Sequence, residues 1–197
     1  MPKVVDHEER RAELCAAVWR LASREGLEAV TVRRVADEAG WSTGGVVHYF
    51  SDKEDLLLSA FQTVADRVSR RLEKVEEATS APLELARAWL VEGLPLDSDR
   101  KAEVRVWFAL LGLALTRPAL ARAQRLTYRA WRGRLEELLR DAQDAGEIRA
   151  GVDCAGTAAA LVAMVDGLAI RATFEPRAVS AERAVELVDA HLGALRS

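Results

Sequence analysis

Hydrophobic residues recur at every third or fourth position through most of the chain, which is the period of one face of an α-helix. Nine stretches show this period, and they span residues 6–25, 31–39, 43–50, 53–72, 82–92, 99–115, 118–146, 153–174 and 180–195. No alternating run of apolar and polar residues is bounded by turn signals. The pattern therefore predicts an all-α fold of about nine helices.

One segment, residues 31–53, has an order of residue types that favours one particular arrangement. Thr31 is suited to cap a helix, because its hydroxyl can accept a hydrogen bond from a free backbone amide. Gly40 follows the last residue of that helix, where a left-handed backbone costs glycine nothing. Ser42 can then cap a second helix. The segment predicts a helix-turn-helix, followed at Ser51-Asp52-Lys53-Glu54 by a capping-box pattern for a long helix.

The second helix of this pair, predicted from Thr43 to Phe50, has two different faces. Val46, Val47 and Phe50 are expected to pack against the first helix. The other side carries small and polar residues, namely Thr43, Gly44, Gly45 and His48. Glycine inside a helix costs about 1 kcal/mol relative to alanine, so a Gly-Gly pair suggests that a phosphate or a base edge approaches the backbone closely. The alternative is an ordinary helical hairpin with a loose loop.

The segment contains the runs Thr-Val-Arg-Arg-Val-Ala-Asp-Glu-Ala-Gly, Ser-Thr-Gly-Gly-Val-Val-His-Tyr-Phe and Asp-Lys-Glu-Asp-Leu-Leu. Together they resemble the signature of TetR-type (tetracycline-repressor-like) regulators. That family usually carries a hydrophobic residue where Trp41 stands and often a larger side chain where Gly45 stands. The resemblance implies a helix-turn-helix DNA-binding domain over residues 1–52 and a ligand-binding and dimerisation domain over 53–197. It implies contacts to DNA from Thr31, Arg33, Ser42, Thr43, Gly44, Gly45, His48, Tyr49 and Lys53.

Composition and charge narrow the possible partners. Half of the 197 residues are hydrophobic, which excludes a disordered chain, and the net charge is −3. Phosphate affinity must therefore come from a few well-placed cations, hydroxyls and helix N-termini. No uncharged run reaches the roughly 20 residues that cross a bilayer, and the start lacks the apolar core of a signal peptide. We expect a cytoplasmic protein that does not bind a membrane.

No residue pattern indicates catalysis or a metal site. The chain lacks a phosphate-binding glycine loop followed by Lys-Ser/Thr, a Gly-x-Ser-x-Gly run and a His-Glu-x-x-His run. Its three histidines, His7, His48 and His191, show no metal-ligand spacing. Cys15 and Cys154 form no motif, so we expect inert thiols, with a redox switch as the alternative. Neither an enzyme, a cofactor nor a metal is expected.

Aromatic residues gather on three successive helices of the predicted body. Tyr128 and Trp131 are three residues apart and so share one helix face. Aromatic rings beside the carboxylates of Glu103 and Asp166 would favour a cation. The predicted site for a small apolar or cationic effector comprises Trp89, Glu103, Trp107, Phe108, Leu111, Tyr128, Trp131, Met164 and Asp166. The alternative is that these rings are plain core.

The last two predicted helices differ from the others in kind. Residues 153–174 carry little charge apart from Asp166 and Arg171, so this helix should be buried on two sides. Residues 180–195 supply an amphipathic partner, and one side of the pair can pack against a second copy. The predicted dimer interface comprises Leu161, Val165, Leu168, Ala184, Leu187 and Val188. A monomer whose interior takes both faces is the alternative.

Short runs in the body, Arg105-Val-Trp-Phe, Trp131-Arg-Gly-Arg-Leu and Val165-Asp-Gly-Leu, resemble the choline-responsive BetI-type branch of the same family. The two resemblances together imply a ligand-responsive transcriptional regulator, most often a repressor. Such a protein binds double-stranded DNA at a palindromic operator as a homodimer and responds to a small-molecule effector. The alternative is a helical protein-interaction scaffold without specific DNA binding.

Overall fold

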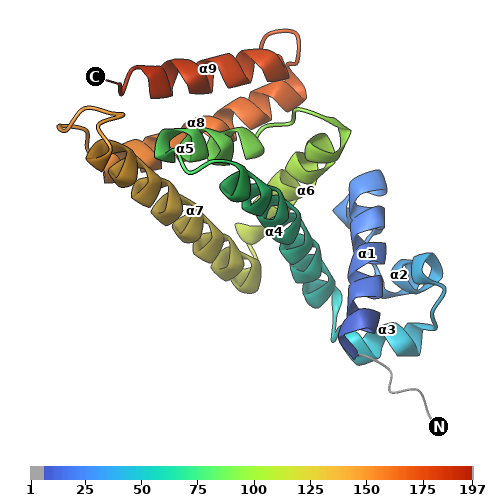
Figure 1. Ribbon diagram of the computed structural model, residues 1–197. Helices are drawn as coiled ribbons and strands as arrows, with labels where there is room; N and C mark the ends of the chain where they lie inside the picture. The colour runs from blue at the N-terminus through green and yellow to red at the C-terminus, as the bar shows by residue number, and fades with distance from the viewer. Residues whose placement is uncertain (1–6, 197) are drawn as a thin grey trace. The chain divides into compact units, whose positions relative to one another are not determined.

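The computed structural model describes residues 7–196 (Figure 1), and within them it contains nine α-helices, one short 3₁₀ helix and no strand. The α-helices are α1 (His7–Glu25), α2 (Val32–Ala39), α3 (Thr43–Tyr49), α4 (Lys53–Ala78), α5 (Pro82–Glu92), α6 (Ser98–Ala114), α7 (Pro118–Asp144), α8 (Cys154–Phe174) and α9 (Ala181–Gly193). The 3₁₀ helix, η1 (Leu27–Ala29), joins α1 to α2. The all-α class and the nine helices predicted from the sequence are confirmed. The predicted start of the first helix, Asp6, lies outside the described residues.

The chain forms two compact units that share three long helices. Unit 1 contains the residues up to Arg67 and Arg105–Ala123, and unit 2 contains Val68–Val104 and the residues from Gln124 onward. Helices α4, α6 and α7 therefore contribute residues to both units. The boundary predicted after residue 52 coincides with the start of α4 at Lys53 and otherwise stays a prediction.

Unit 1 holds the two short helices α2 and α3 against α1. Leu14, Val18 and Leu21 recur on one face of α1 and are almost completely buried. Val35 on α2 and Val46 on α3 meet the same core. A helix as short as α3 has little stability of its own, so burial of these apolar side chains supplies the stability that helix propensity alone does not.

Helix α4 begins with reciprocal hydrogen bonds. Asp52 Oδ1 accepts from the backbone N–H groups of Glu54 (2.7 Å) and Asp55 (3.0 Å). Asp55 Oδ2 accepts from the backbone N–H (2.9 Å) and the hydroxyl (2.6 Å) of Ser51, and these bonds lower the pKa of the Asp55 carboxyl. The capping box predicted from Ser51 to Glu54 was therefore wrong by one residue: Asp52 is the cap and Asp55 reaches back.

Unit 2 is organised around α5, α8 and α9, which pack against one another (Figure 1). Leu90, Leu161 and Val188 are buried among them. The end of α5 approaches α8 so closely that a Cβ atom at Gly93 would lie 2.6 Å from Cγ1 of Val165. Gly93 therefore allows a contact between helices that no larger residue would permit without a shift.

Candidate nucleic-acid interface

The turn between α2 and α3 is fixed by local hydrogen bonds. Thr31 Oγ1 accepts from the backbone N–H of Arg34 (3.3 Å), and Ser42 Oγ accepts from that of Gly45 (3.1 Å). Gly40 has φ of 72° and ψ of 29°, the left-handed conformation that ends α2. The N–H of Trp41 donates to the carbonyl of Ala36 at 2.9 Å. The helix, the turn and both caps predicted from the sequence are confirmed.

The exposed side of α3 carries most of the residues predicted to face DNA. Thr43, Gly44 and His48 are exposed, whereas Val46 and Phe50 are fully buried. Val47 was predicted to pack inward, and this was wrong, because 53% of the residue is exposed. Residues i and i+4 share a helix face, so burying Val46 and Phe50 turns Val47 about 100° away from the core.

The two glycines of α3, Gly44 and Gly45, have different surroundings. A Cβ atom at Gly44 would have only Ser42 Oγ near it, at 4.0 Å, so the backbone there is open to a ligand. A Cβ atom at Gly45 would lie 3.0 Å from Cε3 of the Trp41 indole. The neighbouring ring thus supplies a reason for glycine at position 45 that the sequence-based explanation, close approach of DNA, did not include.

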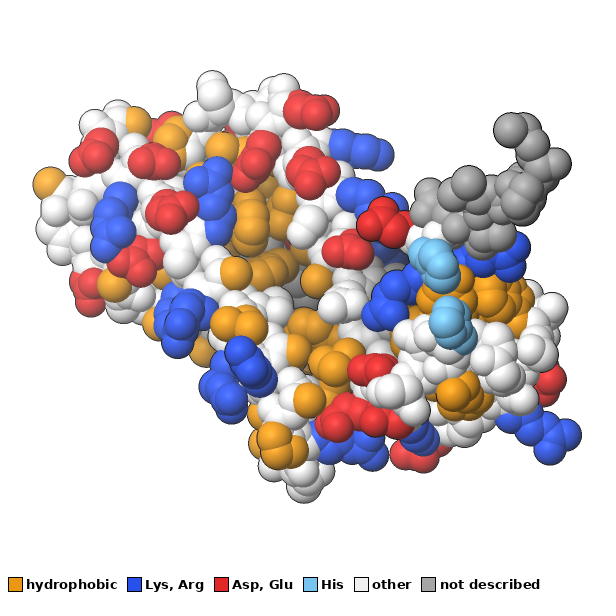
Figure 2. Space-filling view, turned by 90° about the horizontal axis from the view of Figure 1, so that it is seen from below, with side chains coloured by type: hydrophobic (Ala, Val, Ile, Leu, Met, Phe, Trp, Pro, Cys, Tyr) orange, Lys and Arg blue, Asp and Glu red, His pale blue; other side chains and the backbone are white. Residues whose placement is uncertain are grey.

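Aromatic and imidazole rings cluster beside the end of α3. The ring centroids of His48 and Tyr49 are 5.3 Å apart, and those of His7 and His48 are 6.0 Å apart. The Tyr49 hydroxyl lies 3.2 Å from His7 Nδ1, and the Tyr49 residue is half-buried. Figure 2 shows histidine side chains close together on one face, with hydrophobic side chains beside them. Tyr49 is therefore not a fully buried core ring, because its polar end reaches a surface group.

Ion pairs neutralise Glu38 on α2 and leave two nearby cations available. Glu38 bonds Arg20 (2.7 Å) and Arg24 (2.9 Å), and these bonds lower the pKa of its carboxyl. Arg33 is exposed, and no ion pair among residues 7–196 involves it. Lys53 lies 4.0 Å from Glu28, an exposed contact of little energetic weight. Arg33 and Lys53 can therefore bind phosphates without first breaking a strong pair.

Four of the predicted effector residues form two adjoining pairs within unit 2. The rings of Trp89 on α5 and Trp131 on α7 meet edge to face, with centroids 5.2 Å apart. The Tyr128 hydroxyl donates to Asp166 Oδ2 on α8 at 2.5 Å. Burial raises the pKa of the Asp166 carboxyl, and the hydrogen bond from Tyr128 partly offsets that rise. Tyr128 and Trp131 lie on one face of α7, so the two pairs are neighbours.

The other predicted effector residues have different surroundings. Glu103 is buried and accepts two hydrogen bonds from the Arg71 guanidinium, at 3.0 and 2.5 Å, so its charge is already balanced. Trp107 belongs to unit 1, as do Phe108 and Leu111, and its ring stacks on Phe61 at 5.3 Å. Met164 on α8 is half-buried.

The residues predicted at the dimer interface divide by exposure. Leu161, Val165, Ala184 and Val188 are buried within the chain, and Leu168 and Leu187 are half-buried. Helix α8 keeps another face exposed, formed by Ala159, Ala160, Ala163, Gly167, Ile170 and Phe174. Helix α8 is also long and apolar enough to span a membrane, with a mean hydropathy of 1.5 over its most apolar 18-residue window. Only 28% of that window is buried within the chain. The structure thus presents a largely apolar surface on α8 beside the predicted residues.

Comparisons with known proteins match both parts of the chain. Residues 14–60 match the bacterial regulatory proteins of the tetR family, and residues 82–197 match the C-terminal part of BetI-type transcriptional repressors. The HTH-type transcriptional regulator PksA of Bacillus subtilis (strain 168) is 30% identical over 192 residues, which covers 98% of this chain and 92% of that protein.

Solved structures agree with this match. A transcriptional regulator from Rhodococcus sp. Rha1 is 34% identical with a TM-score of 0.80, covering 94% of this chain and 95% of that one. A transcriptional regulator from Saccharomonospora viridis, solved in complex with choline, is 22% identical with a TM-score of 0.86, covering 94% and 96%. The chain belongs to the TetR family, with a BetI-type C-terminal part. It is a DNA-binding transcriptional regulator and not an enzyme.

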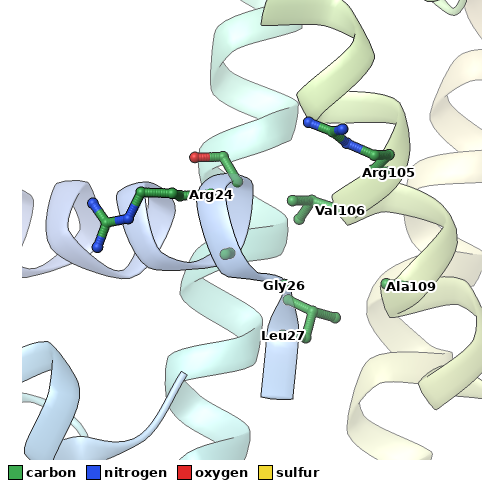
Figure 3. A pocket seen from close by; sticks show the side chains of 8 residues that line it. Arg24, Gly26, Leu27, Arg105, Val106 and Ala109 are labelled. Atoms are coloured by element: carbon green, nitrogen blue, oxygen red, sulfur yellow. The ribbon is translucent and has the colours of Figure 1, made fainter. Parts of the chain in front are cut away.

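One cleft of this TetR-family chain lies away from the predicted effector residues. Its volume is about 200 Å³, and it lies in unit 1 between the end of α1 and α6 (Figure 3). Leu27 and Val106 line it, whereas the Arg24 side chain extends away and bonds Glu25 and Glu38. Effector pockets are usually about 300–1,000 Å³, so this cleft is a poor candidate.

Sequence reasoning missed two groups in unit 2 of this TetR-family regulator. Arg71 bonds Glu92 as well as Glu103, and nothing in the sequence set it apart from Arg67 and Arg70 on the same amphipathic helix. Gln124 is only 5% exposed, and neither polar atom of its side chain has a partner among the described residues. Its position four residues before Tyr128 on α7 was the available signal, because that spacing places both on one face.

Proposed function

We propose that this chain is a repressor that binds a palindromic operator as a homodimer and leaves it when a small effector binds. The observation that carries the proposal is the bare, exposed first turn of α3, capped by Ser42 and open at Gly44. The N-terminal residues of a recognition helix enter the major groove in helix-turn-helix proteins. Thr43 and Gly44 are therefore proposed to approach bases.

Phosphate contacts are proposed for the polar residues around that turn. Arg33 and Lys53 supply exposed or half-exposed charge, and the imidazole of His48 is exposed beside Tyr49. The other proposed phosphate contacts are Thr31, Ser42 and Tyr49. Gly45 lies beside them, but the Trp41 ring covers the side of Gly45 where a side chain would project. Phosphate contacts fix the position of a protein on DNA, whereas base contacts determine sequence preference.

A binding assay with two variants separates these roles. The DNA is the duplex that the wild-type protein enriches from a random pool, with a random duplex for comparison. Lys53→Ala should weaken binding to both duplexes about equally and lower the salt slope by about 1 per lost contact. Thr43→Ala should instead change the enriched sequence. If the wild-type protein enriches no sequence, the scaffold alternative is correct.

The homodimer is proposed to form through the exposed side of α8, with α9 beside it. Ile170 is 39% exposed and Phe174 is 78% exposed on a helix whose other exposed residues are mostly small. Small residues let two helix backbones approach closely, and a second copy would remove the two large side chains from water. The buried Leu161 and Val165 would support this face from within, while Leu168 and Leu187 would lie at its edge.

Sedimentation of a charged variant tests the dimer. The Phe174→Glu variant should sediment as a monomer. It should also lose operator binding indirectly, because two DNA-binding domains must reach half-sites about 34–36 Å apart or a multiple of that distance. The control is Leu115→Glu in unit 1, where the residue is 84% exposed and should tolerate the charge. A wild-type protein that sediments as a monomer at micromolar concentration would refute the dimer.

The effector is proposed to be a small molecule that carries a cation and binds beside α7 in unit 2. Asp166 is partly buried, and no ion pair among the described residues involves it, so a cationic ligand would supply its counter-charge. The Trp89 and Trp131 rings adjoin it, and aromatic faces attract a cation by roughly 0.5–2 kcal/mol. Gln124 offers an amide on the same helix face. The choline bound in the Saccharomonospora regulator has this chemistry.

Tryptophan fluorescence with matched probes tests the effector class. Choline should quench the tryptophan fluorescence of the wild-type protein and release the protein from DNA. Its neutral isostere 3,3-dimethylbutan-1-ol should have both effects more weakly. Asp166→Asn should abolish that difference, because the amide keeps the shape without the charge. Release by anionic amphiphiles alone would exclude a cationic effector.

We also propose that the protein acts in the cytoplasm, where its DNA lies.

A further inference from the structure

Trp41 occupies the space of a side chain on α3. Its Cε3 and Cζ3 atoms lie 3.0 and 3.7 Å from the point where a Cβ of residue 45 would be. The residue is only half-buried, so part of the indole stays at the surface beside the first turn of the helix. The α2–α3 turn thus supplies an aromatic surface beside the first turn of α3, and that turn has no aromatic residue of its own.

A cation lies over the Trp41 ring. The guanidinium carbon of Arg10, the fourth residue of α1, lies 5.2 Å from the Trp41 ring centroid. Arg10 is exposed, and none of the ion pairs among residues 7–196 involves it. A guanidinium over a ring is held by the electrostatic attraction of its face, while its N–H groups lie in its own plane and stay available to bond an anion.

The neighbouring arginine has a different role. Arg11 donates to the backbone carbonyl of Tyr49 at 2.9 Å, and its guanidinium lies 4.7 Å from the centroid of the buried Phe50 ring. One Arg11 nitrogen is thus already bonded within the fold, and its guanidinium faces a buried ring rather than a surface one. Two consecutive arginines on α1 therefore differ: Arg11 ties α1 to the end of α3, and Arg10 is presented at the surface beside the start of α3.

We propose that Arg10 is a DNA phosphate contact and that Trp41 is the residue that positions it, with Gly45 leaving room for the ring. This inference rests on the proposed DNA binding by α3. Rigid placement by the indole spares the guanidinium part of the entropy that a free arginine loses on binding.

The experiment measures DNA affinity against salt for full-length protein. The probes are the duplex enriched by the wild-type protein and a random duplex. Each phosphate contact contributes about 0.9 to the slope of log K against log salt, so Arg10→Ala should lower the slope by about 2 for a dimer on both probes. Arg177→Ala, which removes another exposed charge, in unit 2, is the control and should leave the slope unchanged.

Two further variants test the role of Trp41. Trp41→Phe should keep the slope, because a ring face remains, whereas Trp41→Leu should lower it nearly as much as Arg10→Ala. Adding Arg10→Ala to Trp41→Leu should then cause little further loss. Gly45→Ala should weaken binding in the wild-type background, where its methyl displaces the ring, and not in the Trp41→Leu background.

The outcomes distinguish this inference from the proposed function. If the wild-type protein binds no duplex, the proposed function fails. If it binds and Arg10→Ala leaves the salt slope at the wild-type value, or if the losses from Arg10→Ala and Trp41→Leu simply add, the inference is overturned and DNA binding stands. Thermal unfolding of every variant shows that each one is folded at the assay temperature.

Discussion

Replacing Arg71 with alanine tests whether the charged network of unit 2 stabilises the fold. The Arg71 guanidinium bonds Glu92 at 2.6 Å and Glu103 at 3.0 and 2.5 Å, and it joins α4 to α5 and α6. Both carboxylates are buried, and Arg100 holds the other oxygen of Glu92 at 2.6 Å. The bonds raise the pKa of Arg71 above its ordinary value, so the side chain is charged at any working pH.

The magnitude follows from what the substitution leaves behind. Removing one partner of a buried ion pair costs roughly 3–5 kcal/mol, because a buried charge loses its compensation. The Arg71 side chain is 27% exposed, which screens part of the interaction. Glu92 keeps its bond to Arg100, which limits the loss at that carboxylate. We therefore expect Arg71→Ala to lower the free energy of unfolding by about 3 kcal/mol, the low end of that range.

Urea unfolding followed by circular dichroism at pH 7 measures this loss. Arg134→Ala is the matched control, because Arg134 pairs with Glu76 at 3.0 Å where both side chains are about a third exposed. It should cost less than about 1 kcal/mol. The double variant Arg71→Met/Glu103→Met should be more stable than Arg71→Ala, because it removes both charges together. A loss no larger than that of Arg134→Ala, or a double variant less stable than the single one, would refute the reasoning.

Two further predictions concern single positions. Gly40→Ala should destabilise the protein by about 1–2 kcal/mol in urea unfolding, because φ at Gly40 is 72°; Gly112→Ala, in α6 with open space around it, should instead be neutral or stabilising, and equal effects would contradict the argument. Burial raises the pKa of Asp166, so its ionised form costs stability above that pKa and the cost is relieved as pH falls through it. Asp166→Asn should therefore melt at a higher temperature than wild type at pH 8, with the difference shrinking at pH 5, and a variant that melts lower at pH 8 would show that the Tyr128 hydrogen bond matters more.

Burial also accounts for the two cysteines. It raises the pKa of both the Cys15 and the Cys154 thiols above their ordinary value. The thiolate is the reactive form, so both side chains are less reactive than a free cysteine at neutral pH. The inert thiols expected from the sequence stay a prediction.

The sequence by itself determined the helices and the turn of the DNA-binding motif. Thr31, Gly40 and Ser42 act on amides and dihedral angles within a few residues of themselves, so their roles follow from local order. Asp153 and Ser180 cap α8 and α9 in the same way. The resemblance of residues 31–53 to TetR-type regulators was sufficient to identify the family for the same reason, because the motif is continuous in the chain.

Tertiary structure decided which side chains of these helices are free to act. Periodicity could not show that Val47 is exposed or that Glu103 is neutralised by Arg71, 32 residues earlier. Nor could it show that the Trp41 ring lies beside Gly45, or that the Arg10 guanidinium of another helix lies over that ring. Helix formation depends on neighbours three or four residues away, whereas these contacts join residues on separate elements, and only their packing in three dimensions brings them together.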